Sequence, residues 1–331
     1  MKQVFIDSET WQDYFRGWEI VAVAVRDRNI LHLCARKSVS PDEASHGADH
    51  DIPTKIVGVY LDEPPGKVNG QRQNIGGQEL SGMKLPVLGV SRMPFTRPSG
   101  LVSARNRDGD TWPFGGGSGP MEHIAPGQHP FPNRLKCISG FTYAVCYPRE
   151  IYKRIAVGKW ELFGAIPCPK QELDRAGFND MDAFSDSDIY AVGGHGDVWH
   201  FDGSQWRQMG FPSNVQLATV TCAADGNVYI SGEGGSLWIG RKSTWKRVYK
   251  GESSLLWNDA LWFDNKLWLA SDYQFRTWNG KELEQVTHNG EQVFINGHMD
   301  AYDGVLAIAS SSVVMTFDGN EWRTIVAPYF D

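Results

Sequence analysis

Apolar and polar positions alternate in short runs through the C-terminal half of the chain, and turn-forming residues separate these runs. The run Ile189-Tyr190-Ala191-Val192-Gly193 is followed by Val198-Trp199-His200-Phe201, then by Asp202-Gly203 and Trp206. Short alternating runs bounded by Asp, Gly and Asn are typical of strands joined in hairpins. The pattern predicts antiparallel β structure.

This pattern occurs four times at a spacing of 39 residues. The equivalent aromatic or small positions are Tyr190, Tyr229, Trp268 and Ala307, and the equivalent strand ends are Gly193, Gly232, Ser271 and Ser310. Four short strands in about 40 residues make one blade of a β-propeller. The fold class is therefore all-β, with four regular blades over residues 178–327.

The N-terminal part, residues 1–177, follows the pattern less regularly. Strands are expected at 19–25, 30–35 and 56–61. Two segments, 38–55 and 91–135, are too polar or too rich in Gly and Pro to read as blade strands, so they are interpreted as loop insertions. The remaining length suits three longer blades. A single propeller domain over 1–331 with seven blades is favoured, and six blades is the alternative.

An Asp-Gly-x-x-Trp element is expected at the turn between the third and outer strands, with its Trp packed on the neighbouring blade. Asp7-Ser8-Glu9-Thr10-Trp11 resembles this element. Propellers often close by pairing a strand from one terminus with the blade built from the other, which removes an exposed edge. The N-terminal segment is a candidate for that role.

Charge and cysteine content limit the functional classes. The formal net charge is −7, which argues against broad nucleic-acid or anionic-membrane binding and favours a basic partner. Five cysteines without a CxxC pair indicate free thiols, and a Cys137–Cys146 bridge would suit only an oxidising compartment. No apolar run has the length of a membrane span or of a signal peptide's apolar segment, so a cytoplasmic location is expected.

No motif for a cofactor or metal is evident. The cluster His46, Asp49, His50 and Asp51 has no known ligand spacing, and the run Gly115–Gly117 lacks the Lys-Ser/Thr of a phosphate loop. A glycosidase needs two carboxylates in one pocket. The carboxylates available in loops and strands are Asp197, Glu233, Asp259, Asp272 and Asp300, and the sequence does not show which converge. We predict no enzymatic activity, no cofactor and no metal.

A protein-binding face fits the repeat better. Loops between second and third strands and loops between blades are expected at one face, where acidic groups beside aromatics suit a basic partner. The candidate partner-binding residues are His195, Asp197, Glu233, Glu252, Trp257, Asp272, Tyr273, Glu291 and His298.

Residues Asp188 through Trp206 carry the clearest copy of a pattern, Asp-x-Tyr/Trp-Ala-Val-Gly followed by Trp-His-x-Asp-Gly-x-x-Trp, that resembles bacterial propellers. By general type, such acidic propellers resemble the immunity proteins that bacteria keep against secreted antibacterial toxins. The resemblance implies a protein that binds one basic toxin domain, such as a nuclease, and occludes its active site. A propeller that acts on glycans or small ligands in a central pocket, and a general interaction scaffold, are the alternatives.

Overall fold

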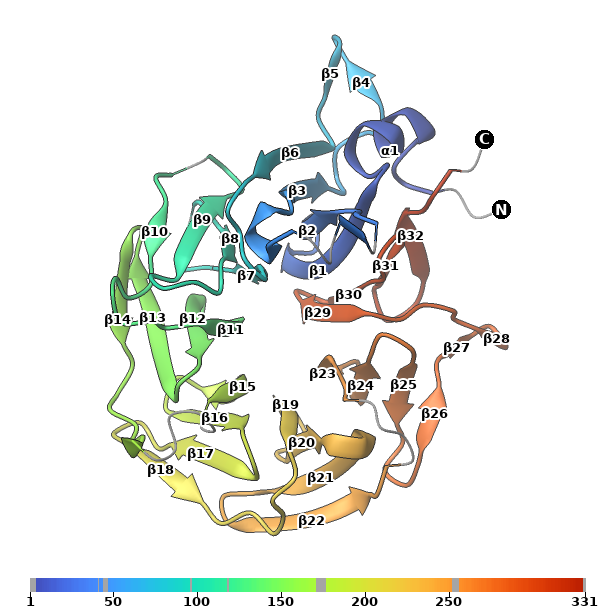
Figure 1. Cartoon of the computed structure of the whole chain (residues 1–331). Coiled ribbons are helices and arrows are strands. Elements are labelled where there is room, and N and C mark those ends of the chain that lie inside the picture. Colours follow the sequence, from blue (N-terminus) through green and yellow to red (C-terminus); the bar gives the residue numbers. More distant parts are fainter. Residues whose placement is uncertain are drawn as a thin grey trace.

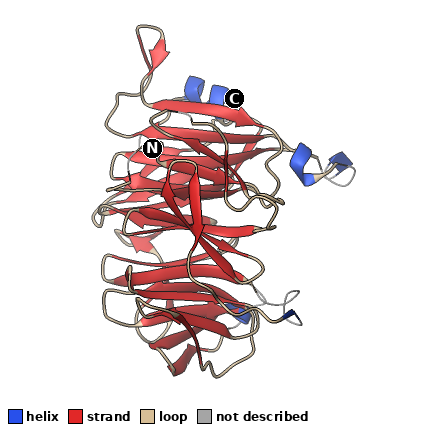
Figure 2. Ribbon diagram, turned by 90° about the vertical axis from the view of Figure 1, so that its left-hand side faces the viewer, coloured by secondary structure: helices blue, strands red, loops and turns tan. Residues whose placement is uncertain are grey.

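The computed structural model describes residues 4–40, 42–43, 47–95, 97–117, 119–170, 177–251 and 256–329. Within these ranges the chain forms seven four-stranded antiparallel sheets, arranged in a ring around a central opening (Figure 1). Figure 2 shows the ring from its edge, with connecting loops on both faces. The predicted all-β propeller with seven blades is confirmed.

Blades 1 to 3 come from the N-terminal half, and each begins with its innermost strand. Blade 1 contains β1 (Trp18–Asp27), β2 (Ile30–Lys37), β3 (Thr54–Tyr60) and β6 (Ile75–Leu80). Blade 2 contains β7 (Val87–Val90), β8 (Gly100–Ser103), β9 (Asp110–Phe114) and β10 (Glu122–His123). Blade 3 contains β11 (Pro132–Ile138), β12 (Phe141–Cys146), β13 (Glu150–Ala156) and β14 (Lys159–Leu162).

Blades 4 to 7 are the four regular copies. Blade 4 contains β15 (Phe178–Ser185), β16 (Asp188–Gly193), β17 (Asp197–Phe201) and β18 (Trp206–Met209). Blade 5 contains β19 (Leu217–Cys222), β20 (Val228–Gly232), β21 (Ser236–Arg241) and β22 (Thr244–Tyr249). Blade 6 contains β23 (Asp259–Phe263), β24 (Lys266–Ala270), β25 (Phe275–Trp278) and β26 (Leu283–Gln285). Blade 7 contains β29 (His298–Tyr302), β30 (Val305–Ala309), β31 (Val314–Phe317) and β32 (Trp322–Val326).

Short elements decorate the ring. Two hairpins lie outside the blades, β4 (Lys67–Val68) with β5 (Gln71–Arg72) and β27 (Thr287–His288) with β28 (Glu291–Gln292). Helical elements in the described ranges include α1 (Ser8–Tyr14), η1 (Asp49–Asp51) and η3 (Glu233–Gly235).

The core is divided among the contacts between blades. Seven clusters of buried apolar side chains each join two neighbouring blades. In β16, Ile189 and Ala191 pack toward blade 3, whereas Tyr190 and Val192 pack toward blade 5. Successive side chains of a strand point to opposite faces of the sheet. Apolar side chains at alternate positions therefore pack on the blade at one face and on the blade at the other face. A fully buried side chain of this kind contributes roughly 1.5–3 kcal/mol.

On the innermost strand of a blade, some backbone N–H groups have no acceptor within their own sheet. Aspartate carboxylates accept hydrogen bonds from several of these N–H groups. Asp180 Oδ2 accepts the N–H of Val220 at 3.0 Å. Asp182 Oδ2 accepts the N–H of Cys222 at 2.8 Å. Each bond runs from the innermost strand of blade 4 to that of blade 5. Buried N–H groups without an acceptor are costly, so these carboxylates join adjacent blades at the channel wall.

The ring closes between blades 7 and 1 with the same kind of bond. Asp300 Oδ2 accepts the N–H of Val25 at 2.8 Å and a hydrogen bond from Arg92 Nη2 at 2.8 Å. Arg92 also donates to the Val25 carbonyl at 2.7 and 3.0 Å. One joint thus connects strands β29 and β1 with the loop that follows β7.

The N-terminal segment closes the ring differently from the prediction. Asp7 is the N-cap of α1, with Oδ1 accepting the Thr10 N–H at 2.8 Å, so Asp7–Trp11 starts a helix and does not form the strand-turn element. An Asp before Ser-Glu satisfies free N–H groups of a first helical turn, which explains the helix. Phe5 and Ile6 donate N–H bonds to the carbonyls of Thr324 and Ile325. Blade 7 nevertheless takes all four of its strands from the C-terminal part of the chain.

The interpretation of 91–135 as an insertion is corrected. This range contains β8, β9, β10 and the first residues of β11. Its glycine content reflects close packing: a Cβ at Gly100 would lie 2.7 Å from the ring of Phe114. The segment 38–55 does lie between two strands, with η1 in it and β3 beginning at Thr54.

We expect Asp300→Ala to lower the free energy of unfolding by about 2 kcal/mol, because it leaves the Val25 N–H without an acceptor and removes the carboxylate partner of Arg92. Urea unfolding followed by tryptophan fluorescence measures this. Glu321→Ala, at an exposed site, should stay within about 0.5 kcal/mol of the wild type. Equal stabilities of the two variants would show that the closure does not depend on Asp300.

Candidate partner-binding face and central pocket

Turns between second and third strands meet the connections between blades on one face of the ring. The Leu217 N–H donates to the Gly194 carbonyl at 3.2 Å, and the Glu233 N–H donates to the Gln216 carbonyl at 2.8 Å. Between blades 6 and 7, the Gly297 N–H donates to the Ser271 carbonyl at 2.7 Å. These bonds hold the loops that carry the predicted partner-binding residues together on one face.

Five of those residues are exposed on this face. His195 lies in the turn after β16, Glu233 begins η3, and Asp272 and Tyr273 form the turn after β24. Glu291 lies on the β27–β28 hairpin. Asp272 Oδ1 accepts a hydrogen bond from Asn258 Nδ2 at 2.6 Å, so a connection between blades fixes its position.

Asp197 and Trp257 have internal roles. Asp197 is buried, and its carboxylate accepts bonds from Arg149 Nε at 2.8 Å and from Trp199 Nε1 at 2.7 Å. Trp257 is buried and donates from Nε1 to the Gly235 carbonyl at 3.2 Å. A position at a loop does not reveal which way a side chain points, so the sequence could not separate these two from their exposed neighbours. Glu252 lies outside the described residues.

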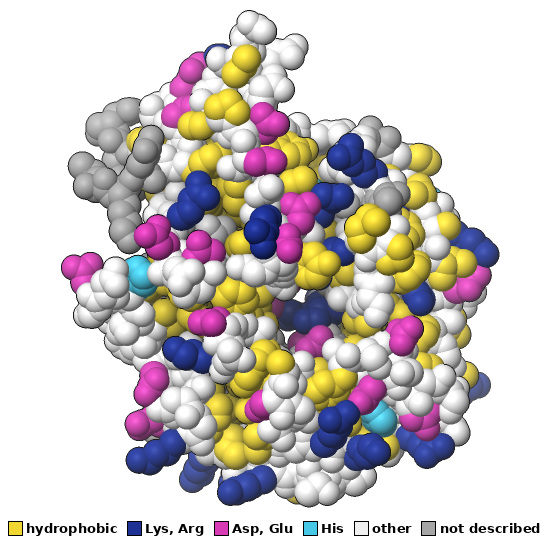
Figure 3. All heavy atoms as spheres, turned by 180° about the vertical axis from the view of Figure 1, so that it is seen from behind, with side chains coloured by type: hydrophobic (Ala, Val, Ile, Leu, Met, Phe, Trp, Pro, Cys, Tyr) yellow, Lys and Arg dark blue, Asp and Glu magenta, His cyan; other side chains and the backbone are white. Residues whose placement is uncertain are grey.

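A pocket of about 490 Å³ occupies the centre of the ring and is lined by the innermost strands. Figure 3 views the ring from behind, and basic and acidic side chains meet at its central opening. Arg134 Nη1 lies 2.5 Å from Asp259 Oδ1, and Arg134 Nε lies 3.4 Å from Asp180 Oδ1. Lys136 Nζ lies 3.6 Å from Asp180 Oδ1.

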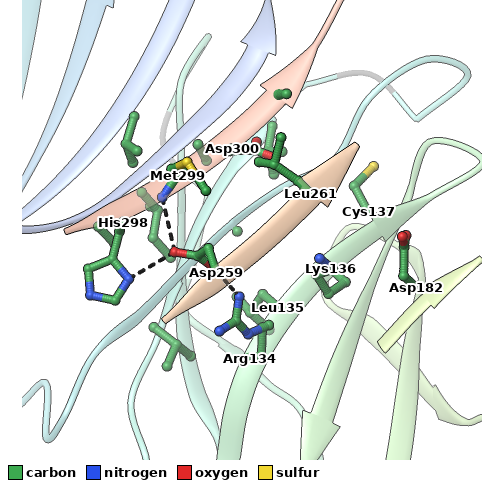
Figure 4. Close-up of a pocket in the computed structure, with 18 of the residues that line it drawn as sticks. Arg134, Leu135, Lys136, Cys137, Asp182, Asp259, Leu261, His298, Met299 and Asp300 are labelled. Carbon is green, nitrogen blue, oxygen red and sulfur yellow. Dashed lines mark hydrogen bonds and ion pairs between the residues drawn. The ribbon is translucent and has the colours of Figure 1, made fainter. Parts of the chain in front are cut away.

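Asp259 contacts three groups at the pocket. Figure 4 shows it between His298, Met299 and Arg134. Oδ2 accepts the Met299 N–H at 3.0 Å and lies 3.1 Å from His298 Nδ1. Burial raises the pKa of Asp259, but the charge of Arg134 and the bonds from His298 and Met299 outweigh burial and hold this pKa well below its usual range.

Asp182 has the opposite shift. Burial raises the pKa of its carboxyl above the usual value, although Lys136 and the Cys222 N–H act against this. The pocket therefore contains acids whose pKa values are displaced in opposite directions, which is a feature of ligand and catalytic sites as well as of structural ion-pair networks. Asp182, Asp259 and Asp300 line this pocket, and each also accepts a backbone N–H from the adjacent blade.

Sequence reasoning named Asp259 and Asp300 among the available carboxylates but missed the basic side chains Arg92, Arg134 and Lys136. A signal for the acids was present, because Met181-Asp182-Ala183-Phe184 and Met299-Asp300-Ala301-Tyr302 place Asp at the same point of two innermost strands. The basic residues lie in the irregular blades, where no repeat register locates them.

The structure also locates the possible metal ligands and the cysteines that the sequence contains. Over the described ranges, no group of three His, Cys, Asp or Glu side chains is arranged to hold a metal. His46 lies outside those ranges, and Asp49 is engaged by Arg36 Nη1 at 3.3 Å and by the Leu85 N–H at 2.6 Å. All five cysteines are free. Within the described part of the chain, no helix is long and apolar enough to cross a membrane.

Comparison with known proteins identifies a sequence relative. The chain is 33% identical over 213 residues to the immune protein Tsi7 of Pseudomonas aeruginosa, and the match covers 63% of this chain and 65% of that protein. The similarity thus spans slightly less than two thirds of Tsi7. No protein-family model matches the chain.

Solved structures resemble the fold at low sequence identity. The WD40 β-propeller domain of Doa1 superposes with a TM-score of 0.55 at 12% identity, over 88% of this chain and 90% of that one. YCF48 from Cyanidioschyzon merolae gives 0.55 at 10% identity, over 91% and 92%. These similarities establish the propeller architecture alone.

We expect His298 to titrate above its ordinary value of about 6.5. Burial lowers the pKa of His298, but the hydrogen bond and charge of Asp259 outweigh burial and raise it. Because the folded-state pKa is raised, the stability contributed by protonated His298 is fully present below about pH 6.5 and is lost as the pH rises through the folded-state pKa. NMR titration of the ring measures this midpoint. Asp259→Asn should lower it, and a wild-type midpoint at or below 6.5 would contradict the assignment.

Proposed function

We propose that this protein is an immunity protein, which binds a bacterial toxin and neutralises it without catalysis. The observation that carries the proposal is the 33% identity to the immune protein Tsi7 over 213 residues. A rigid ring with exposed loops gathered on one face is consistent with a protein-binding role, since loops on a fixed scaffold commonly carry recognition.

The proposed mechanism is steric occlusion of the toxin's active site. Asp272, Glu233 and Glu291 are exposed on the loop face, and the whole chain has a net charge of −7. Such a surface attracts a basic protein and accelerates encounter with it. A nuclease domain fits this description, because the cations that it uses to bind phosphates would meet the acidic loops. Neutralisation would take place in the cytoplasm, and it needs no cofactor.

A second candidate function has its own supporting observation. Three aspartates, Asp182, Asp259 and Asp300, line the central pocket, and the pKa values of Asp182 and Asp259 are displaced in opposite directions. A glycan or another small polar ligand bound there would use these groups. The same aspartates accept backbone N–H groups of adjacent strands. Arg92 pairs with Asp300, Arg134 pairs with Asp259, and the charge of Lys136 acts on Asp182, which accounts for these acids without a ligand.

Co-expression tests the first candidate directly. A toxin encoded beside the gene for this chain should arrest growth when expressed alone and be tolerated when this chain is expressed with it. A tagged chain should retain that toxin in stoichiometric amount after washing at both low and high salt. Growth arrest that persists with the chain present, together with no retained toxin, would rule out the immunity role and direct attention to glycan and small-molecule screens.

Charge reversal on the loop face should slow association. We expect Glu233→Lys combined with Glu291→Lys to lower the association rate with the neutralised toxin by about tenfold at low salt, with a smaller effect at high salt because ions screen the attraction. Stopped-flow fluorescence or surface plasmon resonance measures the rate. Glu321→Lys, in the turn after β31 and thus on the opposite face, is the matched control. Equal rates for the two variants would show that the acids of the loop face do not steer the partner.

A further inference from the structure

The most exposed aromatic side chains of the described chain lie at one groove. Phe294 is 81% exposed and Tyr273 is 72% exposed. Both line a groove of about 300 Å³ between blades 6 and 7. Tyr273 comes from the turn after β24, and Phe294 comes from the connection between β26 and β29. Two large apolar side chains left in water at one place are typical of a protein-binding site.

The turn that carries Tyr273 has a counterpart in blade 7, which shows that the fold does not require an aromatic there. Ser271 Oγ accepts the N–H groups of Tyr273 at 3.3 Å and Gln274 at 3.0 Å. In blade 7, Ser310 Oγ accepts the N–H groups of Ser312 at 3.4 Å and Val313 at 3.1 Å. Ser312 follows Tyr273 by 39 residues and occupies the same position of the same turn. The ring is built equally well with a serine there.

Phe294 is displayed from a fixed backbone. Its neighbours Val293 and Ile295 are partly buried and pack on the apolar cluster between blades 6 and 7. The Val293 N–H donates to the Val286 carbonyl at 2.9 Å. Alternation along this extended segment therefore turns Phe294 outward while both neighbours anchor it. An aromatic held in place before binding loses little conformational entropy on binding, which favours affinity.

The connection that carries Phe294 is long because the outer strand β26 has only three residues, while the 39-residue spacing from β23 to β29 is unchanged. It spans 12 residues, 286–297, and contains the β27–β28 hairpin, whereas the connection between β18 and β19 spans seven. Glu291 on the hairpin directly precedes Gln292, which lines the groove, and Asp272 directly precedes Tyr273, which lines its other side. Arg276, on β25, lines the groove and offers donors to carbonyl groups.

From these observations we infer that the groove between blades 6 and 7 is the anchoring site for the toxin. Its occupant is a protein segment that inserts an aliphatic or aromatic side chain between Tyr273 and Phe294 and carries Lys or Arg at the points that meet Asp272 and Glu291. The apolar centre with a charged rim is the usual anatomy of a stable protein interface. This inference rests on the immunity role proposed above and names the surface that performs it.

The test uses the full chain and the purified toxin that the wild-type chain neutralises in co-expression. Tyr273→Ser introduces the residue that blade 7 has in the same turn, and Phe294→Ser removes the second anchor. Each variant should raise the Kd by at least about thirtyfold, mainly through faster dissociation, because central aromatic anchors dominate binding. Leu162→Ser, at an exposed apolar position on β14, should change the Kd by less than about threefold.

Two outcomes separate this inference from the function on which it depends. If the wild type neutralises the toxin and both serine variants bind as tightly as the wild type, the groove is not the anchor and the immunity role stands. If the wild type binds no toxin, both fail. Hydrogen–deuterium exchange provides a readout that needs no variant: toxin should protect the amides of 271–274 and 291–296. Protection confined to other loops would overturn the inference.

Discussion

The architecture depends on how the innermost strands satisfy their free edges. The innermost strands of the seven blades surround the central channel. The outer edge of each innermost strand pairs with the second strand of its own blade. Innermost strands of adjacent blades belong to separate sheets, so they do not form a continuous ladder. Aspartates bridge that separation by accepting N–H groups across it, as Asp182 does for Cys222 and Asp300 does for Val25. A buried N–H without an acceptor costs about 1–3 kcal/mol. An exposed ion pair contributes only about 0–1 kcal/mol, so several of them would be needed to offset that cost.

This solution determines the character of the channel. Carboxylates placed to accept backbone N–H groups need counter-charges, and Arg92, Arg134 and Lys136 supply them. A similar buried pair joins blades 2 and 3, where Arg154 and Glu122 are both fully shielded from water and bonded to each other. A polar, charge-balanced centre is thus a property of the scaffold itself, and it explains why converging carboxylates alone do not identify an active site in this fold.

The repeat made the fold predictable, whereas side-chain direction and irregular blades limited the prediction of the site. The 39-residue repeat located blades 4 to 7, because each copy keeps apolar side chains on both faces of its sheet at the same positions of the repeat. It failed for β8 and β9, where Gly100 and Pro113 mask strands that are short and tightly packed. It also could not separate Asp197, which is held by Arg149, from the exposed Asp272, since both follow the same kind of strand end. Phe294 was missed because the β27–β28 hairpin before it is not repeated in the described connections of the other regular blades.

The shared geometry of the Ser271 and Ser310 turns has a consequence for how such a protein evolves. The serine hydroxyl fixes the backbone, and the residue two positions later points into solvent, so that residue is under almost no folding constraint. Recognition residues can therefore be exchanged at this position while the hydrogen bonds and the core stay the same. If the binding partners of such a protein diversify, substitutions at these turns could change binding specificity without lowering stability. Different residues determine the two properties.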